Sequence, residues 1–366
     1  MSQATNLYAL SITQCAELIA TVAHETTVLV SGDIGSGKSS ILHILDERFP
    51  KHTACYFDCT TKDLGDITLP RIADTDADGA SLPFVSYATN EELGAHIDKP
   101  IILMIDEYGK ANPAVKNALL RLMQERQIGS YKLHRDSLIF ATTNLGGEGV
   151  GDLLPPHARN RIMNVRMTKP TSTAWIDWGI NNELDTSILG WVRETPQVMA
   201  SFEDVQNPDD NPYIYHPRSQ RAAFVTPRSL HKASNLLKRR GGLDDHTITA
   251  GLIGTLGDRA AMDLMAFVSL ADDLPSLESI KRDPLNAKVP AGAAAVCMIV
   301  YRTLSIIERE WIDAWMTYLD RLPAEAAGMF ANGVRAKGYS KQGMMMTHAA
   351  FTAWARKNSH LFAADV

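Results

Sequence analysis

Gly32-Asp33-Ile34-Gly35-Ser36-Gly37-Lys38-Ser39 is the stretch that decides the fold of this 366-residue chain. It matches the pattern G-x-x-x-x-G-K-[ST] at every position. An apolar, β-branched run at residues 26–30 precedes it, and helix-compatible residues 40–45 follow it. A strand, a glycine-rich loop and the start of a helix, in that order, predict a phosphate-binding loop.

The residue types of this loop suit the binding of a nucleoside triphosphate with Mg²⁺. Glycines let the backbone curl so that successive N–H groups point at the phosphates, and the following helix adds the positive end of its dipole. We expect Lys38 to contact the β- and γ-phosphates and the hydroxyl of Ser39 to ligate Mg²⁺. The predicted nucleotide-binding residues are Gly32, Asp33, Ile34, Gly35, Ser36, Gly37, Lys38, Ser39 and Ser40.

The most apolar strand candidate begins with five apolar residues, 101–105. Two carboxylates, Asp106 and Glu107, follow them directly. Five consecutive apolar residues are typical of a strand buried on both faces of a parallel sheet. Open α/β sheets bind their ligands at the carboxyl edge of such strands. Asp106 is therefore predicted to hold the Mg²⁺ shell, and Glu107 to act as the general base for the attacking water.

Asn144 ends another predicted strand, residues 137–144. A neutral amide at that edge can orient a water against a γ-phosphate without adding charge. Taken alone, an asparagine at a strand end is usually a turn residue, so this role for Asn144 depends on the phosphate loop and the two carboxylates described above.

Strands are predicted to alternate with helices up to Lys169-Pro170. The fold class is therefore α/β, with a five-stranded parallel sheet covered on both sides. Strands are expected at residues 26–30, 54–58, 101–107, 137–144 and 162–167, and helices at 11–23, 40–45, 91–97 and 113–127. Beyond residue 170 the pattern is helical. The predicted domains are a nucleotide-binding core at 1–170, a helical lid at 171–270 and a C-terminal helical extension at 271–366.

Composition narrows the functional classes. The chain is 45% hydrophobic and 21% charged, as in an ordinary soluble globular protein, and its net charge of −6 gives no basic field for non-specific nucleic-acid binding. Its four cysteines form no metal-site spacing, which favours buried thiols in a reducing cytoplasm. No signal peptide is expected, and the apolar run at residues 291–300 is predicted to be a buried helix rather than a membrane span.

Two other stretches invite a functional interpretation that we do not favour. Residues 74–79 match the first half of a calcium loop, but Val85 stands where the bidentate Glu should be, so residues 60–80 are predicted to form a solvated loop. The basic run at residues 238–240, followed by two glycines, is typical of the end of a helix that begins at Thr226-Pro227-Arg228.

Taken in order, these features resemble an AAA+ ATPase, and within that group the MoxR type. The resemblance covers about residues 25–270, and residues 112–126 carry its most MoxR-specific part. The other matching stretches are residues 32–39, 101–107, 141–144, 154–161 and 226–228.

The resemblance implies a role for each matching residue. It makes Lys38, Ser39, Asp106 and Glu107 the Walker residues. The implied catalytic set is Glu107, Asn144 as sensor 1, Arg161 as the arginine finger and Arg228 as sensor 2. Arg159 is an alternative finger, because Ile162 stands where the family usually has Phe. A finger completes the site of a neighbouring subunit, so the family implies a hexameric ring.

We therefore expect a cytoplasmic ring ATPase that remodels or activates a partner protein, chaperone-like, with no membrane or nucleic-acid partner. The family suggests a partner with a von Willebrand factor A domain. Members of the clade carry an insertion after the second strand; here residues 60–90 are mostly polar, with Phe84 and Tyr87 as candidate pore contacts.

Two alternatives stay open. A nucleic-acid-dependent motor or loader would need basic residues facing a pore, which the net charge and the lack of a helix-turn-helix do not favour. A nucleotide-gated scaffold would bind ATP but hardly hydrolyse it, which Glu107, Asn144 and the candidate trans arginines do not favour.

Overall fold

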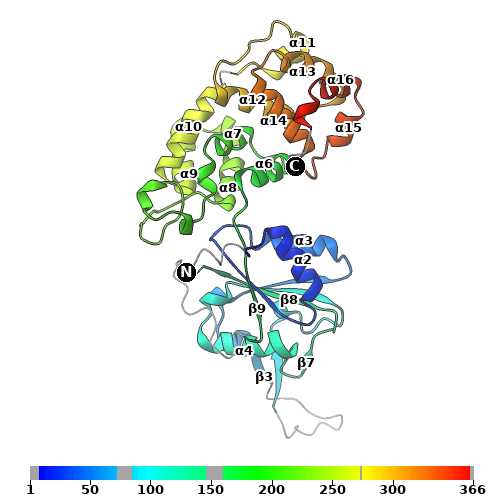
Figure 1. Cartoon of the computed structure of the whole chain (residues 1–366). Helices are drawn as coiled ribbons and strands as arrows, with labels where there is room; N and C mark the ends of the chain where they lie inside the picture. The colour runs from blue at the N-terminus through cyan, green and yellow to red at the C-terminus, as the bar shows by residue number, and fades with distance from the viewer. Residues whose placement is uncertain (1–7, 72–84, 146–159, 273, 363–366) are drawn as a thin grey trace. The chain divides into compact units, whose positions relative to one another are not determined.

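The computed structural model describes residues 8–71, 85–145, 160–272 and 274–362 of the chain. The chain divides into two compact units, Met1–Lys169 and Pro170–Val366 (Figure 1). Each unit has its own buried apolar core. In the second unit, side chains from both sides of residue 270 share one apolar cluster, and the division into a lid and an extension stays a prediction.

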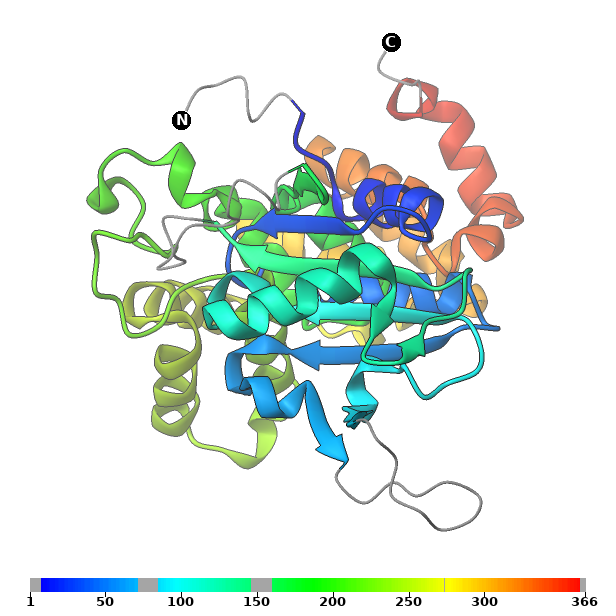
Figure 2. The same ribbon diagram turned by 90° about the horizontal axis from the view of Figure 1, so that it is seen from below.

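Five parallel strands form the central sheet of the first unit, in the spatial order β2-β5-β8-β1-β9 (Figures 1 and 2). Their bounds are β1 Val28–Gly32, β2 Thr53–Asp58, β5 Ile101–Asp106, β8 Leu138–Asn144 and β9 Met163–Arg166. Every residue of β5 and β8 is buried, as the apolar runs predict. The structure thus confirms the predicted fold class, an α/β core with a five-stranded parallel sheet followed by a helical region.

Helices cover both faces of this sheet because successive strand residues point to opposite sides. Ile102 and Met104 pack with α2 (Ile12–Val22) and α3 (Ser40–Arg48). Leu103 and Ile105, from the same strand, pack with α4 (Pro113–Glu125). The side chain of Asn112 caps α4 by accepting from Val115 N, and Pro113 opens its first turn.

The stretch predicted as a solvated loop contains a strand. β3 (Thr68–Arg71) pairs antiparallel with β4 (Ser86–Thr89), so the prediction of a plain loop at residues 60–80 is wrong. Leu69 is 60% exposed and Tyr87 43% exposed, and a two-stranded arm with exposed apolar side chains gives no alternating pattern that would announce it. The half calcium loop and Phe84 lie outside the described residues.

The helix predicted at residues 91–97 is also wrong. Only a 3-10 turn, η3 (Glu91–Leu93), forms there, because Gly94 takes a left-handed φ of +65° that ends it. A Cβ at Gly94 would lie 2.7 Å from Cys55 Sγ, so the glycine is also required for close packing. The remaining small elements of this unit are β6 Gln127–Ile128, β7 Tyr131–Lys132, η1 Cys59–Thr61, η2 Leu64–Asp66 and η4 Tyr108–Lys110.

All the regular secondary structure in the described residues of the second unit is helical, and a largely irregular connection at residues 205–226 interrupts it. Its helices are α6 Ser172–Asn181, α7 Thr186–Glu194, α8 Pro227–Leu237, α9 Asp245–Leu256, α10 Asp258–Asp272, α11 Leu277–Arg282, α12 Ala293–Ile306, α13 Ile312–Leu319, α14 Ala324–Arg335, α15 Gln342–Met346 and α16 Ala349–Lys357. Its 3-10 turns are η6 Pro196–Met199, η7 Phe202–Asp204, η8 Pro208–Asp210, η9 Arg240–Gly242, η10 Arg309–Trp311 and η11 Ser359–Leu361.

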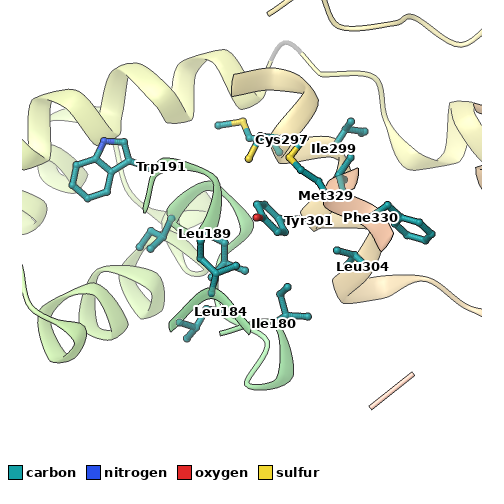
Figure 3. Close-up of a cluster of buried hydrophobic side chains, with 14 of the residues drawn as sticks. Ile180, Leu184, Leu189, Trp191, Cys297, Ile299, Tyr301, Leu304, Met329 and Phe330 are labelled. Atoms are coloured by element: carbon teal, nitrogen blue, oxygen red, sulfur yellow. The ribbon is translucent and has the colours of Figure 1, made fainter. Parts of the chain in front are cut away.

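The centre of the second unit is α12, which contains most of the apolar run predicted as a buried helix. Its side chains pack between residues of α6, α7 and α14 (Figure 3). Helix α14 comes close because Gly333 has no side chain: a Cβ there would lie 2.3 Å from Leu304 Cδ1. None of the helices in the described parts of the chain has the length and apolar character needed to cross a membrane.

All four cysteines are buried and unpaired, as predicted. Burial raises the pKa of the Cys15 and Cys297 thiols to about 12, and the pKa of Cys59 also rises to about 12, first through burial and then through nearby acids that include Asp106 and Glu107. These thiols are therefore uncharged packing groups at neutral pH.

Candidate active site

The phosphate-loop sequence forms the turn that its pattern predicts. β1 ends at Gly32 and α3 begins at Ser40, with the loop between them. Gly35 and Gly37 have φ values of +67° and +99°, a region that residues with a side chain rarely adopt. Ser39 lies at the start of α3, and its hydroxyl makes no capping bond to that helix.

Lys38 is buried among oxygen acceptors. Its Nζ lies 2.8 Å from the carbonyl oxygens of Gly32 and Asp33 and 2.8 Å from Asn144 Oδ1. An ammonium group has three N–H bonds to donate. A phosphate arriving in the loop would therefore compete with these three oxygens for Lys38.

Asn144 joins Lys38 to Glu107. Its Nδ2 lies 3.1 Å from both carboxylate oxygens of Glu107. Lys110 contacts the same carboxylate, with 3.1 Å between Nζ and Oε2. Glu107 has a left-handed backbone, at φ +53° and ψ +35°, a conformation that costs a residue other than glycine about 1–3 kcal/mol. Such strain is concentrated at functional sites, where the surroundings over-determine the geometry.

Asp106 is held by three donors. The hydroxyl of Thr142 and the backbone N–H of Glu107 both donate to Oδ1, the second at 3.1 Å. The hydroxyl of Tyr56 donates to Oδ2 at 2.8 Å. The carboxylate at the end of β5 is thus fixed by its two neighbouring strands, β8 and β2.

Tyr56, Thr142 and Lys110 are not among the site residues predicted from the sequence. Thr142 follows Ala141, which pairs with Ile105, so the strand register brings Thr142 beside Asp106. Lys110 follows Glu107 by three residues, and this spacing is the one signal that the sequence offered for any of the three contacts.

The residues present fit a magnesium–nucleotide complex by their donor chemistry. Mg²⁺ takes oxygen ligands, keeps several waters and is usually held by one or two carboxylates together with substrate phosphates. The Ser39 hydroxyl and the Asp106 carboxylate are such donors, and among the described residues no cluster of three His, Cys, Asp or Glu side chains competes for a metal. Within the same residues, the buried Ser36 Oγ has no hydrogen-bond partner, as expected for a group that meets a ligand.

Arg161 lies at the opposite edge of the sheet from Lys38. It precedes β9, whose Met163 pairs with Val28, and Gly32 follows Val28 by four residues. At about 3.3 Å per residue, roughly 13 Å of strand separates Val28, beside the start of β9, from Gly32, where the phosphate loop begins. Arg161 is exposed, and its Nη1 lies 3.1 Å from Gln124 Oε1 on α4. The alternative finger, Arg159, lies outside the described residues.

Arg228 belongs to the second unit. It lies in the first turn of α8, where Pro227 opens the helix and Thr226 forms a capping box with Ser229. The side chain of Arg228 is exposed. Within the described residues of the first unit, the structure thus brings together Lys38, Asn144 and Glu107, with Asp106 beside them, and leaves Arg161 outside that network.

The chain matches no protein-family model and no curated protein. Similar solved structures include a point mutant of RuvB from Thermotoga maritima, at 13% identity over 75% of each chain with a TM-score of 0.37. The RuvB Holliday junction branch migration motor of the same organism is 15% identical over the same shares, with a TM-score of 0.37. NtrX from Brucella abortus in complex with ADP is 14% identical over 96% of this chain and 68% of its own, with a TM-score of 0.37. At such low identities and scores, the function has to be inferred from the site itself.

Proposed function

We propose that this chain is an ATPase that hydrolyses ATP to ADP and phosphate with Mg²⁺. The observation that carries the proposal is the continuous set of hydrogen bonds from Lys38 through Asn144 to Glu107. It joins the cation of the phosphate loop to a carboxylate that can act as a base. A scaffold that only bound nucleotide would need the first of these groups but not the second.

The roles of the protein groups follow from their positions. The loop N–H groups, the start of α3 and Lys38 bind the phosphates. When phosphate takes Lys38 from Asn144, the amide can reorient toward the attacking water, and Glu107 accepts the proton of that water. Ser39 and Asp106 would hold Mg²⁺, which neutralises charge on the β- and γ-phosphates when bound.

Glu107→Gln tests the proposal. Removing the base while keeping the shape of the side chain should lower kcat at least about 100-fold, with ATP affinity changed by no more than a few-fold. Steady-state phosphate release measures the first and equilibrium dialysis the second. Glu125→Gln, at an exposed glutamate of α4 paired with Arg121, is the matched control and should behave as wild type.

Two outcomes would contradict the proposal. Normal turnover by Glu107→Gln would place the base elsewhere. Tight ATP binding by the wild type with no phosphate release at any protein concentration would favour the nucleotide-gated scaffold. The concentration series matters because a site completed by a neighbouring subunit is inactive in the monomer.

We extend the proposal to a hexameric ring of MoxR type. The position of Arg161 supports it: the side chain is exposed and lies at the sheet edge opposite its own phosphate loop, so it is available to a neighbouring subunit. Arg228 is proposed to act as the second sensor. Specific activity should then rise with protein concentration in parallel with the assembled fraction measured by light scattering.

The work done by the ring is proposed to be the remodelling or activation of a partner protein with a von Willebrand factor A domain, in the cytoplasm. The β3–β4 arm supports a protein partner, because Leu69 and Tyr87 present apolar surface on it. Pull-down with the Glu107→Gln variant, loaded with ATP, should retain the partner. DNA-stimulated hydrolysis with a steep salt dependence would instead favour a nucleic-acid motor.

A further inference from the structure

The turn that follows Glu107 is tied to α4 by two hydrogen bonds, and both involve Lys116. The Nζ of Lys116 donates to the carbonyl oxygen of Gly109 at 2.7 Å. The hydroxyl of Tyr108 donates to the carbonyl oxygen of Lys116 at 3.1 Å. Tyr108 and Gly109 belong to η4, and both are buried. Lys116 therefore ties the main chain directly after the proposed base to α4.

Glu107 lies between two parts of the chain that are held in place. Before it, β5 is paired with β2 on one side and with β8 on the other. After it, the Tyr108 ring is 1% exposed and η4 is held through the carbonyl of Gly109. Between these supports Glu107 has φ +53° and ψ +35°, a left-handed backbone that persists in a residue other than glycine only when its surroundings over-determine it. The bond from Lys116 is one of the contacts that do so.

The backbone conformation of Glu107 decides where its carboxylate points. Nδ2 of Asn144 lies 3.1 Å from both carboxylate oxygens. If the backbone relaxed to a right-handed or extended conformation, the Cβ would turn and the carboxylate would leave this partner. A displacement of about 1 Å can slow a reaction roughly 100-fold, because proton transfer depends on hydrogen-bond geometry. A bond to the main chain two residues further on can thus affect the base without touching it.

Lys116 and Lys110 act on Glu107 in different ways. The Nζ of Lys110 lies 3.1 Å from Glu107 Oε2, and the Lys110 side chain is 40% exposed, so its effect is electrostatic and is screened by salt. Lys116 donates to the Gly109 carbonyl, so its effect passes through the backbone. The Lys116 side chain is partly buried, and its bond is charge-assisted, which makes it about twice as strong as a bond between neutral groups.

We propose that Lys116 is a positioning residue for the reaction: by holding the Gly109 carbonyl it keeps the backbone of Glu107 left-handed and so aims the carboxylate. The inference rests on the proposed function, in which Glu107 is the base. Loss of the bond should slow turnover and leave nucleotide binding unchanged, because the phosphate loop is formed by other residues, between β1 and α3.

Lys116→Met tests the inference, because methionine keeps an unbranched side chain but has no N–H to donate. Its kcat should fall at least about tenfold, while the KM for ATP and the ADP affinity, measured by equilibrium dialysis, stay within about twofold of wild type. Lys116→Arg keeps a donor and should stay within about threefold of the wild-type kcat. Lys132→Met, at an exposed lysine of β7, is the matched control and should behave as wild type.

Two further measurements separate positioning from other roles. Tyr108→Phe removes the second bond of the tie. If the two bonds act as a unit, Tyr108→Phe combined with Lys116→Met should have the kcat of Lys116→Met alone within about twofold, rather than the product of two losses. The loss of kcat in Lys116→Met should also persist at high ionic strength, because a partly buried bond is screened much less than an exposed one.

The outcomes separate the two proposals. A wild-type kcat in Lys116→Met, with Glu107→Gln inactive, would overturn the inference and leave the proposed function standing. A parallel loss of ADP affinity, or an equal loss of kcat in Lys116→Arg, would make Lys116 a general support of the fold and would also overturn it. Losses that multiply, or a difference that disappears at high salt, would contradict it as well. If Glu107→Gln hydrolyses ATP normally, the proposed function fails and the inference fails with it.

Discussion

The two edges of the central sheet hold their charged side chains in different ways. At the carboxyl edge, Lys38 and Glu107 meet through the side-chain amide of Asn144. At the amino edge, the guanidinium of Arg126 donates to the carbonyl oxygens of Ala23 and Ser137, at 2.7 and 3.3 Å. A side-chain amide can turn toward a ligand, whereas the main-chain carbonyls of the buried residues Ala23 and Ser137 cannot. The first arrangement suits a site and the second a structural tie.

Two arginines at the amino edge show the same contrast at close range. Burial lowers the pKa of Arg126 to about 10, still far enough above neutral that the guanidinium is charged and donates to main-chain carbonyls. Arg161 is exposed and bonds to the side chain of Gln124. The two arginines therefore share their charge and their location at the amino edge of the sheet. They differ in the atoms that they contact, and this difference separates a candidate finger from a structural residue.

The largest effect expected concerns Arg161. Because an arginine finger stabilises transition-state charge, Arg161→Ala should lower kcat by about 10³-fold if the residue acts in trans. Mixing Arg161→Ala with Glu107→Gln should restore activity, since some interfaces then pair an intact arginine with an intact base. Phosphate release across mixing ratios measures this recovery.

The control for that experiment is Arg135→Ala, at an arginine whose side chain is 90% exposed and which forms an ion pair with Asp136. It should keep wild-type turnover. Mixtures that show no recovery would move the finger to Arg159 or elsewhere. That result would also mean that Arg161 has no functional role to set against the structural role of Arg126.

The structural role assigned to Arg126 predicts that its removal destabilises the protein. Arg126→Ala removes two charge-assisted hydrogen bonds to carbonyls of buried residues, and each such bond is worth about 1.5–3 kcal/mol. We expect the free energy of unfolding of the first unit to fall by about 3 kcal/mol, as measured by urea titration. Arg135→Ala should change it by less than about 0.5 kcal/mol. Equal losses in both variants would refute the structural assignment of Arg126.

The sequence predicted those parts of the molecule that local pattern determines. Apolar runs identified the central strands, because a strand buried on both faces needs apolar side chains at every position. The phosphate loop was found because glycine is required at φ values such as those of Gly35 and Gly37. The exposed arm of β3 and β4 was missed for the converse reason, since its side chains follow no burial pattern.

The rest of the candidate site depends on register, which the sequence does not contain. Tyr56 and Thr142 meet Asp106 from separate strands, and a shift of one residue in either pairing would turn them to the other face. The left-handed backbone of Glu107 was equally hidden, because glutamate has no preference for it. Such strain is imposed by the surrounding contacts rather than by the residue itself.

The smallest effect expected concerns Lys110, a partner of Glu107 that is partly exposed to solvent. Ion pairs of this kind are worth at most about 1 kcal/mol and are screened by salt. Lys110→Met should therefore change kcat by less than about fivefold, and the difference from wild type should disappear at high ionic strength. Measuring kcat over a salt series for both proteins tests this. Lys357→Met, which removes an exposed ion pair with Asp320 in the second unit, is the matched control and should show no effect at any salt concentration. A much larger loss that persisted at high salt would mean that Lys110 contacts the substrate, so that the carboxyl edge would hold two phosphate-binding cations instead of one.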